Sequence, residues 1–426
     1  MKIIADLQIH SKFSRACSQE LVPKNISLWA KKKGVGVIGT GDFTHPGWLG
    51  MLKEELEEKK PGLYEIREQQ PKAANGSVDP VSFLLTSEVS NIYKQGDKVR
   101  RVHNMIFAPN FTAVDRIRKG LEDRGANLKS DGRPIMGIHC DELVKIVKDA
   151  DAQAEVIPAH AWTPHFGVFG SLSGFDSIAE AFGNQSKYIR CIETGLSSDP
   201  LMNWQISQLD VYALTSNSDA HSLRKIGREA NVFEIDPEAM SYEEIIRILY
   251  SKDPAKFLYT IEFFPEEGKY HLDGHRICKF SCVPARTKSL KGICPVCGKK
   301  LLVGVLNRID ALADRESGFV PPRAIPFKSV IPLEEIIAET FDVGTQSKKV
   351  LAMYEKMLSP SVSEFDVLLE LGEEKIAEIS TREIAASVMR VREGVVHVEA
   401  GYDGLFGKIH IYADAASRPK TQRSLF

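Results

Sequence analysis

Short apolar runs alternate with helical patterns over the first 265 residues, and this alternation limits the folds open to the chain. Seven runs read as buried strands: KIIADLQIH, VGVIGTGDF, FLLTSEVSNIY, VHNMIFAP, AEVIPAHAW, YIRCIETG and VYALTSNSDAH. Amphipathic stretches such as NISLWAKKKG and DELVKIVKDA separate several of them. Strand–helix alternation predicts βα units and a mostly parallel sheet, and seven units in one domain favour a barrel over an open sheet.

Nearly every run ends in a polar residue. The strand-end residues are His10, Asp42, Glu88, His160, Glu193, and Asp219 with His221. In a barrel of parallel strands the carboxyl ends open on one face, where active sites form. We therefore expect these side chains to converge, although a purely structural acid is an equally good interpretation of Glu193.

Nine residues at or near these ends are candidate metal ligands: Gln8, His10, Asp42, His45, Glu88, His103, His160, Asp219 and His221. Mixed His and carboxylate ligands suit zinc, manganese or iron better than magnesium or calcium. More than four candidates imply more than one metal, and paired metals favour phosphate-ester hydrolysis by metal-activated water. His165 is a candidate phosphate contact or acid, with an ordinary loop histidine as the alternative.

The order DLQIH, GTGDFTH, SEV, His103, PAH and SDAH resembles the PHP family, named for polymerases and histidinol phosphatases. The resemblance implies an α/β fold, a distorted (β/α)7 PHP barrel, with a trinuclear centre of divalent metals. It implies catalytic roles for His10, Glu88, Asp219 and His221. The implied ligand sets are His10, Glu88 and Asp219; Glu88, His103 and His160; and His45 and His221 with Asp42. The usual H-x-H motif begins here with Gln8, a weak neutral ligand.

Four cysteines form two close pairs, CKFSC and CPVC. Cys278, Cys282, Cys294 and Cys297 predict a closed tetrahedral zinc site, which is structural. We read His271 and His275 beside them as ordinary residues. The remaining cysteines are scattered, which argues against a secreted disulfide framework and makes the cytoplasm the expected compartment.

The stretch from Gly274 to Lys300 is basic and contains no Asp or Glu. Its candidate contacts to DNA phosphates are Arg276, Lys279, Arg286, Lys288 and Lys291. Residues 365–407 resemble a degenerate helix-hairpin-helix, with a plain helical subdomain as the alternative. The terminal QRSLF resembles a sliding-clamp peptide, with Gln422, Leu425 and Phe426 as its contacts.

The predicted organisation has four parts. They are a PHP metal-dependent catalytic barrel at 1–265, a four-cysteine zinc-binding element and linker at 266–330, a helical DNA-binding domain at 331–415, and a flexible tail with the clamp peptide at 416–426. No apolar run approaches the roughly 18–20 residues of a membrane span, so no membrane partner is expected.

These parts in this order resemble the DNA-repair endonucleases of the PHP family over nearly the whole chain. That resemblance implies hydrolysis of the phosphodiester 5′ of deaminated bases (uracil, hypoxanthine, xanthine) and abasic sites in double- or single-stranded DNA. Aromatic side chains in the loops are candidates to line a pocket for the extruded base: Phe43, Trp48, Trp162, Phe166 and Phe169. Packing beneath the loops is the alternative for each of them. Two rival functions are a small-molecule phosphatase and a non-catalytic, clamp-tethered DNA-binding protein.

Overall fold

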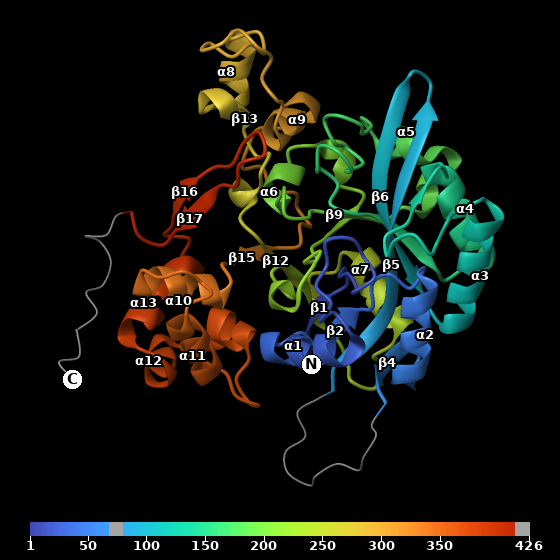
Figure 1. The fold of residues 1–426 in the computed structure, drawn as a ribbon, viewed down its shortest axis with the longest axis horizontal. Helices are drawn as coiled ribbons and strands as arrows, with labels where there is room; N and C mark the ends of the chain where they lie inside the picture. The colour runs from blue at the N-terminus through green and yellow to red at the C-terminus, as the bar shows by residue number, and fades with distance from the viewer. Residues whose placement is uncertain (68–79, 414–426) are drawn as a thin grey trace.

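The computed structural model describes residues 1–67 and 80–413 (Figure 1). Strands of the first 265 residues are β1 (Lys2–Asp6), β2 (Val37–Gly39), β3 (Leu56–Lys60), β4 (Leu63–Ile66), β5 (Ser82–Gln95), β6 (Lys98–Ala108), β7 (Ile135–Met136), β8 (Glu155–Pro158), β9 (Cys191–Glu193), β10 (Ala213–Thr215), β11 (Ala230–Glu234) and β12 (Phe257–Glu262). Helices of this part are α1 (Pro23–Lys33), α2 (Pro46–Glu55), α3 (Phe111–Asp123), α4 (Cys140–Ala150), α5 (Ile178–Phe182), α6 (Pro200–Asn203) and α7 (Tyr242–Ser251).

Local sequence signals explain where these helices begin and end. Pro23 opens α1, where its missing N–H has no partner to lose, and Gly34 ends the helix with φ +89°, a left-handed conformation that suits glycine. Asn110 caps α3 by accepting from the Ala113 amide, and Ser241 caps α7 through the Glu244 amide.

The sheet is mixed, which differs from the mostly parallel sheet that the sequence predicts. Its order begins with a later strand, β15 (Phe327–Ser329), and continues β12-β11-β1-β2-β5-β4-β3, with β6 paired to β5 and β8, and β7 paired to β5. Strands β1, β2 and β5 are parallel, as are β9 and β10. Strand β6 runs antiparallel to both neighbours, and β11 runs antiparallel between β1 and β12.

A two-residue turn causes the largest departure from the predicted parallel βα units. Gly96 and Asp97 join β5 directly to β6, and Gly96 has φ +60°. Two-residue connections make hairpins, whereas parallel strands need a crossover of a dozen or more residues. The predicted α/β class is therefore confirmed, but the strands that carry SEV and His103 form one long hairpin. This hairpin projects from the upper right of the molecule in Figure 1.

Residues after 265 leave the sheet and return to it. The elements here are β13 (Asp273–His275), β14 (Phe280–Cys282), α8 (Pro284–Ser289), α9 (Val305–Leu312) and β15 (Phe327–Ser329). β13 and β14 form a small hairpin below α8, in the lobe at the upper left of Figure 1. β15 then pairs in parallel with β12, so the predicted linker ends as an edge strand of the main sheet.

The last described part is mainly helical, as the sequence predicts. It comprises α10 (Leu333–Phe341), α11 (Lys348–Met357), a π-helical turn (Asp366–Glu370), α12 (Glu373–Ile379), α13 (Arg382–Arg392), β16 (His397–Glu399) and β17 (Lys408–His410). The hairpin of β16 and β17 was not predicted. The clamp-peptide residues Gln422, Leu425 and Phe426 lie outside the described residues.

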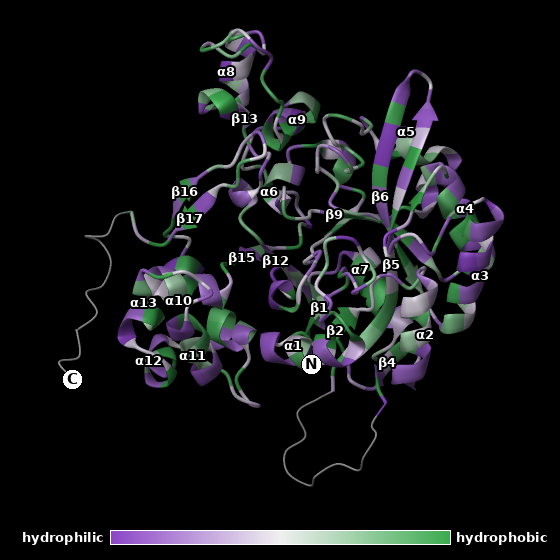
Figure 2. Ribbon diagram, in the orientation of Figure 1, coloured by the Kyte–Doolittle hydropathy of each residue, from purple (hydrophilic) through white to green (hydrophobic). Residues whose placement is uncertain are grey.

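One buried hydrophobic cluster extends from the strands of the first part into these helices, including Ile38, Ile336 and Val388. Figure 2 shows β5 as largely hydrophobic where it runs through the body of the protein. No helix within residues 1–67 and 80–413 combines the length and hydropathy required to cross a membrane.

Candidate active site

The end of β1 meets a loop that lies far along the chain. Asp6, Gln8 and His10 alternate there, and all three are buried. A parallel bridge joins Ile9 to Ala220, and the His10 amide donates to the Ala220 carbonyl oxygen at 3.0 Å. The Asp6 carboxylate accepts from the Ser218 amide at 3.0 Å. These contacts place the DLQIH and SDAH segments side by side.

Six of the nine predicted ligands fall into two groups. One group is His10, Asp219 and His221, and the other is Glu88, His103 and His160. Within each group the candidate ligand atoms lie within 4.8 Å of one another. Strands β5 and β6 bring Glu88 and His103 together, because Ser90 is paired with His103 in the hairpin register.

Glu88 joins the two groups. Its Oε1 lies 2.5 Å from His103 Nδ1 and 3.2 Å from His160 Nε2. Its Oε2 lies 3.0 Å from His10 Nε2, which is also 3.0 Å from Asp219 Oδ1. A carboxylate with one oxygen toward each group has the arrangement of a ligand that bridges two metals.

The donor set fits divalent cations. Ligands of a tetrahedral metal with bonds of about 2.1 Å lie about 3.4 Å apart, close to the separations around Glu88. The buried Gln8 Oε1 and His160 Nδ1 have no hydrogen-bond partner among the described residues. Gln8 instead donates from Nε2 to Glu88 Oε2 at 3.2 Å, so its free oxygen is left for another partner.

The electrostatics of the site keep its carboxylates ionised. Burial alone would raise the pKa of Glu88, but the guanidinium of Arg133 and the hydrogen bonds from His10 and His103 outweigh burial and hold this pKa well below 4.5. Burial likewise opposes ionisation of Asp219, yet the hydrogen bond from His10 helps lower its pKa to about 2. Burial lowers the pKa of His103 to about 4, so its imidazole is neutral and its lone pair available near pH 7.

Three site residues have strained backbones. Asp42, His160 and Asp219 have φ values of +48°, +30° and +47°. Left-handed conformations cost a residue with a Cβ about 1–3 kcal/mol and cluster at functional sites. The strain marks these strand ends as positions shaped by the site.

Three predicted ligands, Gln8, Asp42 and His45, lie outside both groups. Asp42 holds His10, with Oδ1 3.0 Å from Nδ1, while its Oδ2 accepts from the Ser11 amide and the Ser14 hydroxyl. It therefore orients a ligand. His45 caps α2, where its Nδ1 accepts from the amides of Gly47 and Trp48. The implied set of His45 and His221 with Asp42 is not assembled here.

Glu193 and Arg133 complete the surroundings of the site. Glu193 is buried and accepts from the His160 amide at 2.6 Å and from Asn217 at 2.7 Å, which is a structural role. Arg133 Nη1 lies 3.3 Å and 3.5 Å from the two oxygens of Glu88. No spacing pattern in SDGRPIMG distinguishes this arginine, so the sequence analysis missed it.

The aromatic residues mostly form core rather than an open pocket. Four of them are at most 1% exposed: Phe43, Trp48, Trp162 and Phe169. The prediction that they line a base pocket is wrong for these four. Phe166 is half-buried and stacks on His103 at 4.3 Å. His165 is also half-buried and lies edge-on to Tyr270, outside both ligand groups.

The cysteine element gathers a different fourth residue from the one predicted. His275, Cys278, Cys294 and Cys297 form the group, with Cys297 Sγ 3.5 Å from His275 Nδ1. Cys282 is instead 3.2 Å from the Thr287 hydroxyl. The physical reason is the β13–β14 hairpin, which pairs Asp273 with Cys282 and His275 with Phe280. The signal was present in the sequence, because His275 and Cys278 have the same two-residue gap as Cys294 and Cys297.

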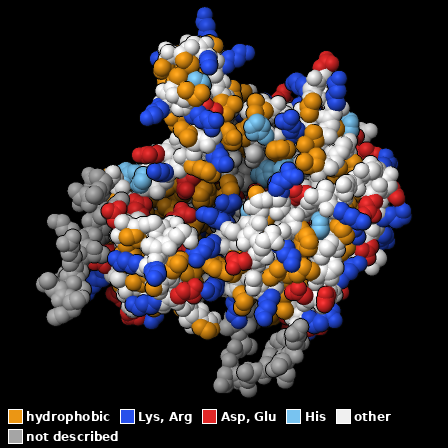
Figure 3. Space-filling model, in the orientation of Figure 1, with side chains coloured by type: hydrophobic (Ala, Val, Ile, Leu, Met, Phe, Trp, Pro, Cys, Tyr) orange, Lys and Arg blue, Asp and Glu red, His pale blue; other side chains and the backbone are white. Residues whose placement is uncertain are grey.

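The predicted phosphate contacts Arg276, Lys279, Arg286, Lys288 and Lys291 are all exposed around α8. Lys288 also pairs with Asp310 at 2.7 Å. Figure 3 shows the molecule hollowed between this lobe and the β5–β6 hairpin, with histidine side chains visible in the hollow.

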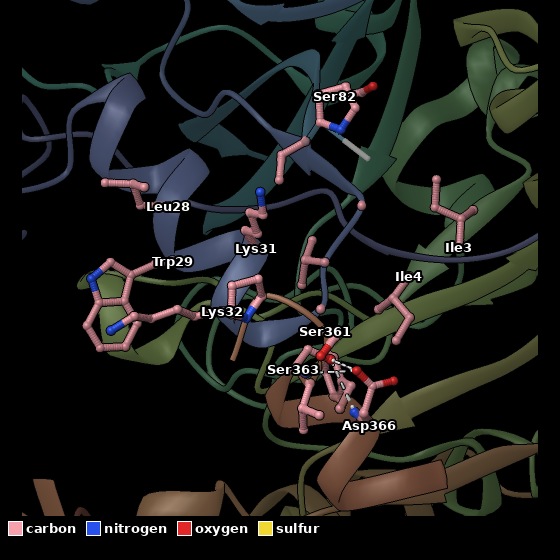
Figure 4. A pocket seen from close by; sticks show the side chains of 18 of the residues that line it. Ile3, Ile4, Leu28, Trp29, Lys31, Lys32, Ser82, Ser361, Ser363 and Asp366 are labelled. Carbon is pink, nitrogen blue, oxygen red and sulfur yellow. Dashed lines mark hydrogen bonds between the residues drawn. The ribbon is translucent and has the colours of Figure 1, made fainter. Parts of the chain in front are cut away.

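A separate cavity of about 1250 Å³ lies away from the ligand groups. It lies between α1 and the segment before α12, and its lining includes Trp29, Lys32, Ser363 and Asp366 (Figure 4). In its lining, the Ser363 amide and hydroxyl donate hydrogen bonds to the Asp366 carboxylate. It contains neither ligand group and belongs to the junction between α1 and the C-terminal helices.

Comparisons with known proteins cover both the full chain and its parts. A family described as the MJ0043 C-terminal domain matches residues 332–395. The chain is 28% identical to the Bacillus subtilis uncharacterized protein YqxK over 96% of this chain and 99% of that protein. It is 29% identical to MJ0043 of Methanocaldococcus jannaschii over 59% of this chain and 31% of that protein.

Two solved structures resemble the whole molecule. The lesion-specific endonuclease PfuEndoQ of Pyrococcus furiosus has 30% identity and a TM-score of 0.84, covering 97% of this chain and 96% of that one. A complex of endonuclease Q with a 27-mer duplex substrate bearing an abasic lesion has 30% identity and a TM-score of 0.83, covering both chains fully. Because this likeness runs through the ligand-bearing part, the cysteine element and the helical region together, the chain belongs to the endonuclease Q family.

Proposed function

We propose that this protein is a DNA-repair endonuclease that hydrolyses the phosphodiester 5′ of deaminated bases (uracil, hypoxanthine or xanthine) and of abasic sites. The observation that carries the proposal is the convergence of two ligand groups on Glu88 in a chain that is 30% identical to lesion-specific endonucleases over its full length. The exposed basic residues around α8 give such a site a surface for the DNA backbone.

The two groups would hold two or three divalent metals, with zinc, manganese or iron favoured over magnesium by the His-rich donors. Bound metals would supply an activated water and stabilise charge on the phosphoryl oxygens. His10, Asp219 and His221 would hold one ion, and Glu88, His103 and His160 another. Gln8 Oε1 is a further donor, and Asp42 keeps His10 in place.

Residues of the chain itself carry the remaining tasks. Arg133 lies beside Glu88 and limits the negative charge of a site that must admit a phosphate. Phe166 covers His103 and lies where it restricts water on that side. His165 remains a candidate for contact with the phosphate or leaving group. The PHP-type barrel, the DNA-binding role of the helical region, and a sliding clamp bound by QRSLF are parts of the same proposal.

The phosphatase alternative explains the ligand groups but leaves the basic surface around α8 without a role. A protein that acts only as a clamp-tethered DNA-binding scaffold leaves unexplained why Glu88 and its histidines converge at ligand separations. Metal analysis separates this scaffold from the enzyme, since a lapsed centre retains only the zinc of the cysteine element, whereas a functional one adds two or three ions.

The decisive experiment incubates the purified protein with duplexes that carry a single uracil, hypoxanthine, xanthine or abasic position. We expect a nick on the 5′ side of the lesion and no phosphate release from a chromogenic monoester. Asp219→Ala and His221→Ala should abolish nicking while DNA binding is largely retained, and Asp149→Ala, on the exposed face of α4, should match the wild type. Retained nicking in a folded Asp219→Ala variant would refute the assignment.

A further inference from the structure

One face of the β5–β6 hairpin continues outward from the candidate active site. Paired residues of an antiparallel hairpin point to the same side, and side chains alternate along each strand. The register pairs Ser90 with His103, Ile92 with Arg101, and Lys94 with Val99. The face that carries Glu88 and His103 therefore also carries Ile92, Lys94, Val99 and Arg101, which we call the ribbon face.

Strand β7 widens this face at its edge. It pairs in parallel with β5, with Ile135 opposite Ser90. Ile135 is 60% exposed and Val99 51% exposed, which is high for residues within paired strands. Lys94 and Arg101 are exposed as well, and neither forms an ion pair within residues 1–67 and 80–413. The ribbon face thus presents two unpaired cations beside apolar side chains.

The opposite face of the hairpin is already covered by protein. Arg100 lies over the Phe175 ring at 3.9 Å and pairs with Glu180 at 2.7 Å. Val102 is fully buried. The opposite face is therefore covered along Arg100 and Val102, whereas the ribbon face is open there, and the inner end of the ribbon face holds a buried hydroxyl, Ser90 Oγ, that has no hydrogen-bond partner in the described structure.

The ribbon face lies where the backbone of an extended polyanion would run as it enters the site. Glu88 and Lys94 lie six residues apart on one strand, a span of about 20 Å. Arg101 is two residues from His103, so its cation lies about 7 Å further out along the strand than that ligand. The β5–β6 hairpin, which carries both cations, lies on the other side of the hollow from the α8 lobe (Figures 1 and 3).

We propose that the ribbon face binds the backbone of the DNA next to the cleaved phosphodiester, with Arg101 and Lys94 on successive phosphates and Val99 and Ile135 against the sugars. This inference rests on the proposed function and identifies a second DNA-binding surface, separate from the basic residues around α8. Cation–phosphate contacts release counterions, so each one adds a measurable salt dependence to binding.

The test compares three proteins: the wild type, a double variant with Lys94→Ala and Arg101→Ala, and the matched control Lys98→Ala. Lys98 is an exposed lysine of the same hairpin, but it pairs with Gln95 and belongs to the opposite face. Affinity for an undamaged fluorescent duplex is measured by anisotropy across a salt series. Single-turnover nicking of an abasic duplex is measured against protein concentration.

For the double variant we expect the salt slope, log K against log salt, to become shallower by about 2, with affinity near 0.1 M salt reduced tenfold or more. The protein concentration for half-maximal nicking should rise by a similar factor, while the maximal rate and the metal content stay unchanged. The Lys98→Ala control should match the wild type.

An unchanged salt slope in the double variant, or an equal loss in the control, would overturn the ribbon-face proposal while wild-type nicking still stands. Absence of lesion nicking by the wild type would instead overturn the proposed function, so the two failures are distinguishable.

Discussion

At the scale of single residues, Arg133 contacts the carboxylate that joins the two ligand groups. Its guanidinium faces both oxygens of the buried Glu88 and remains partly open to solvent, where a substrate phosphate would arrive. Arg133→Ala should lower the nicking rate on the order of 100-fold, the typical effect of removing one donor that stabilises developing charge. Arg133→Lys should recover part of that loss.

Metal content is the control for this prediction, measured on the same preparations by mass spectrometry. If the Arg133→Ala variant keeps its metals and nicks at the wild-type rate, the arginine has no part in the reaction. If metals are lost together with activity, its role is to support Glu88.

Glu262 and Glu229 form a second pair of buried carboxyl groups, and neither belongs to the two ligand groups. Burial raises the pKa of Glu262 to about 8, and burial together with Glu262 raises that of Glu229 well above 4.5. The folded protein therefore keeps protons that the unfolded chain releases above pH 4.5. Its stability should fall as pH rises from 4.5 toward 8, by at most about 1.4 kcal/mol per pH unit for each proton.

Glu262→Gln should flatten this fall, because an amide has no proton to lose and also relieves Glu229. The free energies of unfolding of the variant and the wild type are measured with denaturant at pH 5.5, 6.5 and 7.5. The difference between the two proteins at each pH is compared, because contributions from the metal site cancel in it. Parallel curves for the two proteins would contradict the assigned pKa direction.

At the scale of elements, the cysteine element yields a prediction that distinguishes two ligand sets. The structure groups His275 with three cysteines, whereas the sequence predicts four cysteines. If this element binds zinc as proposed, His275→Ala should abolish zinc binding there and weaken DNA binding, because a closed site needs all four ligands. Cys282→Ser should retain about one zinc in this element, since Cys282 faces Thr287. The zinc content of both variants is measured by releasing the metal with a thiol-reactive reagent. If only Cys282→Ser loses its zinc, the ligands are the four cysteines predicted from the sequence.

Sequence patterns predicted those elements whose signal is local. The α10–α13 helices follow apolar periodicity, and the strand ends that hold Glu88, His160 and Asp219 were recognised because polar residues follow apolar runs. The antiparallel course of β6 depends on a two-residue turn that a search for βα units passes over. His45 and Cys282 were assigned by motif position, whereas their partners are fixed by a helix cap and a hairpin register that motif order does not specify.

At the scale of the whole molecule, a buried ion pair joins α1 to the C-terminal helices. Lys33 Nζ lies 2.6 Å from Glu364 Oε2, and both side chains are 4% exposed. Tyr354 and the Leu333 amide also donate to Glu364. Lys33→Ala leaves a buried carboxylate short of its cation and should destabilise the protein by about 3–5 kcal/mol.

Lys32→Ala is the matched control, since its pair with Glu355 is exposed and should contribute less than about 1 kcal/mol. Thermal unfolding of both variants, followed by calorimetry, compares them. Equal shifts in Tm would mean that the junction between α1 and the helices does not depend on this pair.

The unbroken ladder between β5 and β6, paired from Leu85–Ala108 to Gln95–Lys98, has a consequence for selectivity. The ladder holds Glu88 and Lys94 at a fixed separation, so under the proposed function the protein would offer DNA a rigid surface between the metal ligands and the ribbon face. A duplex bound along such a rigid surface would have to adapt its own shape to it. Because stacking defects make bending cheaper, such stiffness would let mechanical softness of the DNA contribute to the choice of lesion.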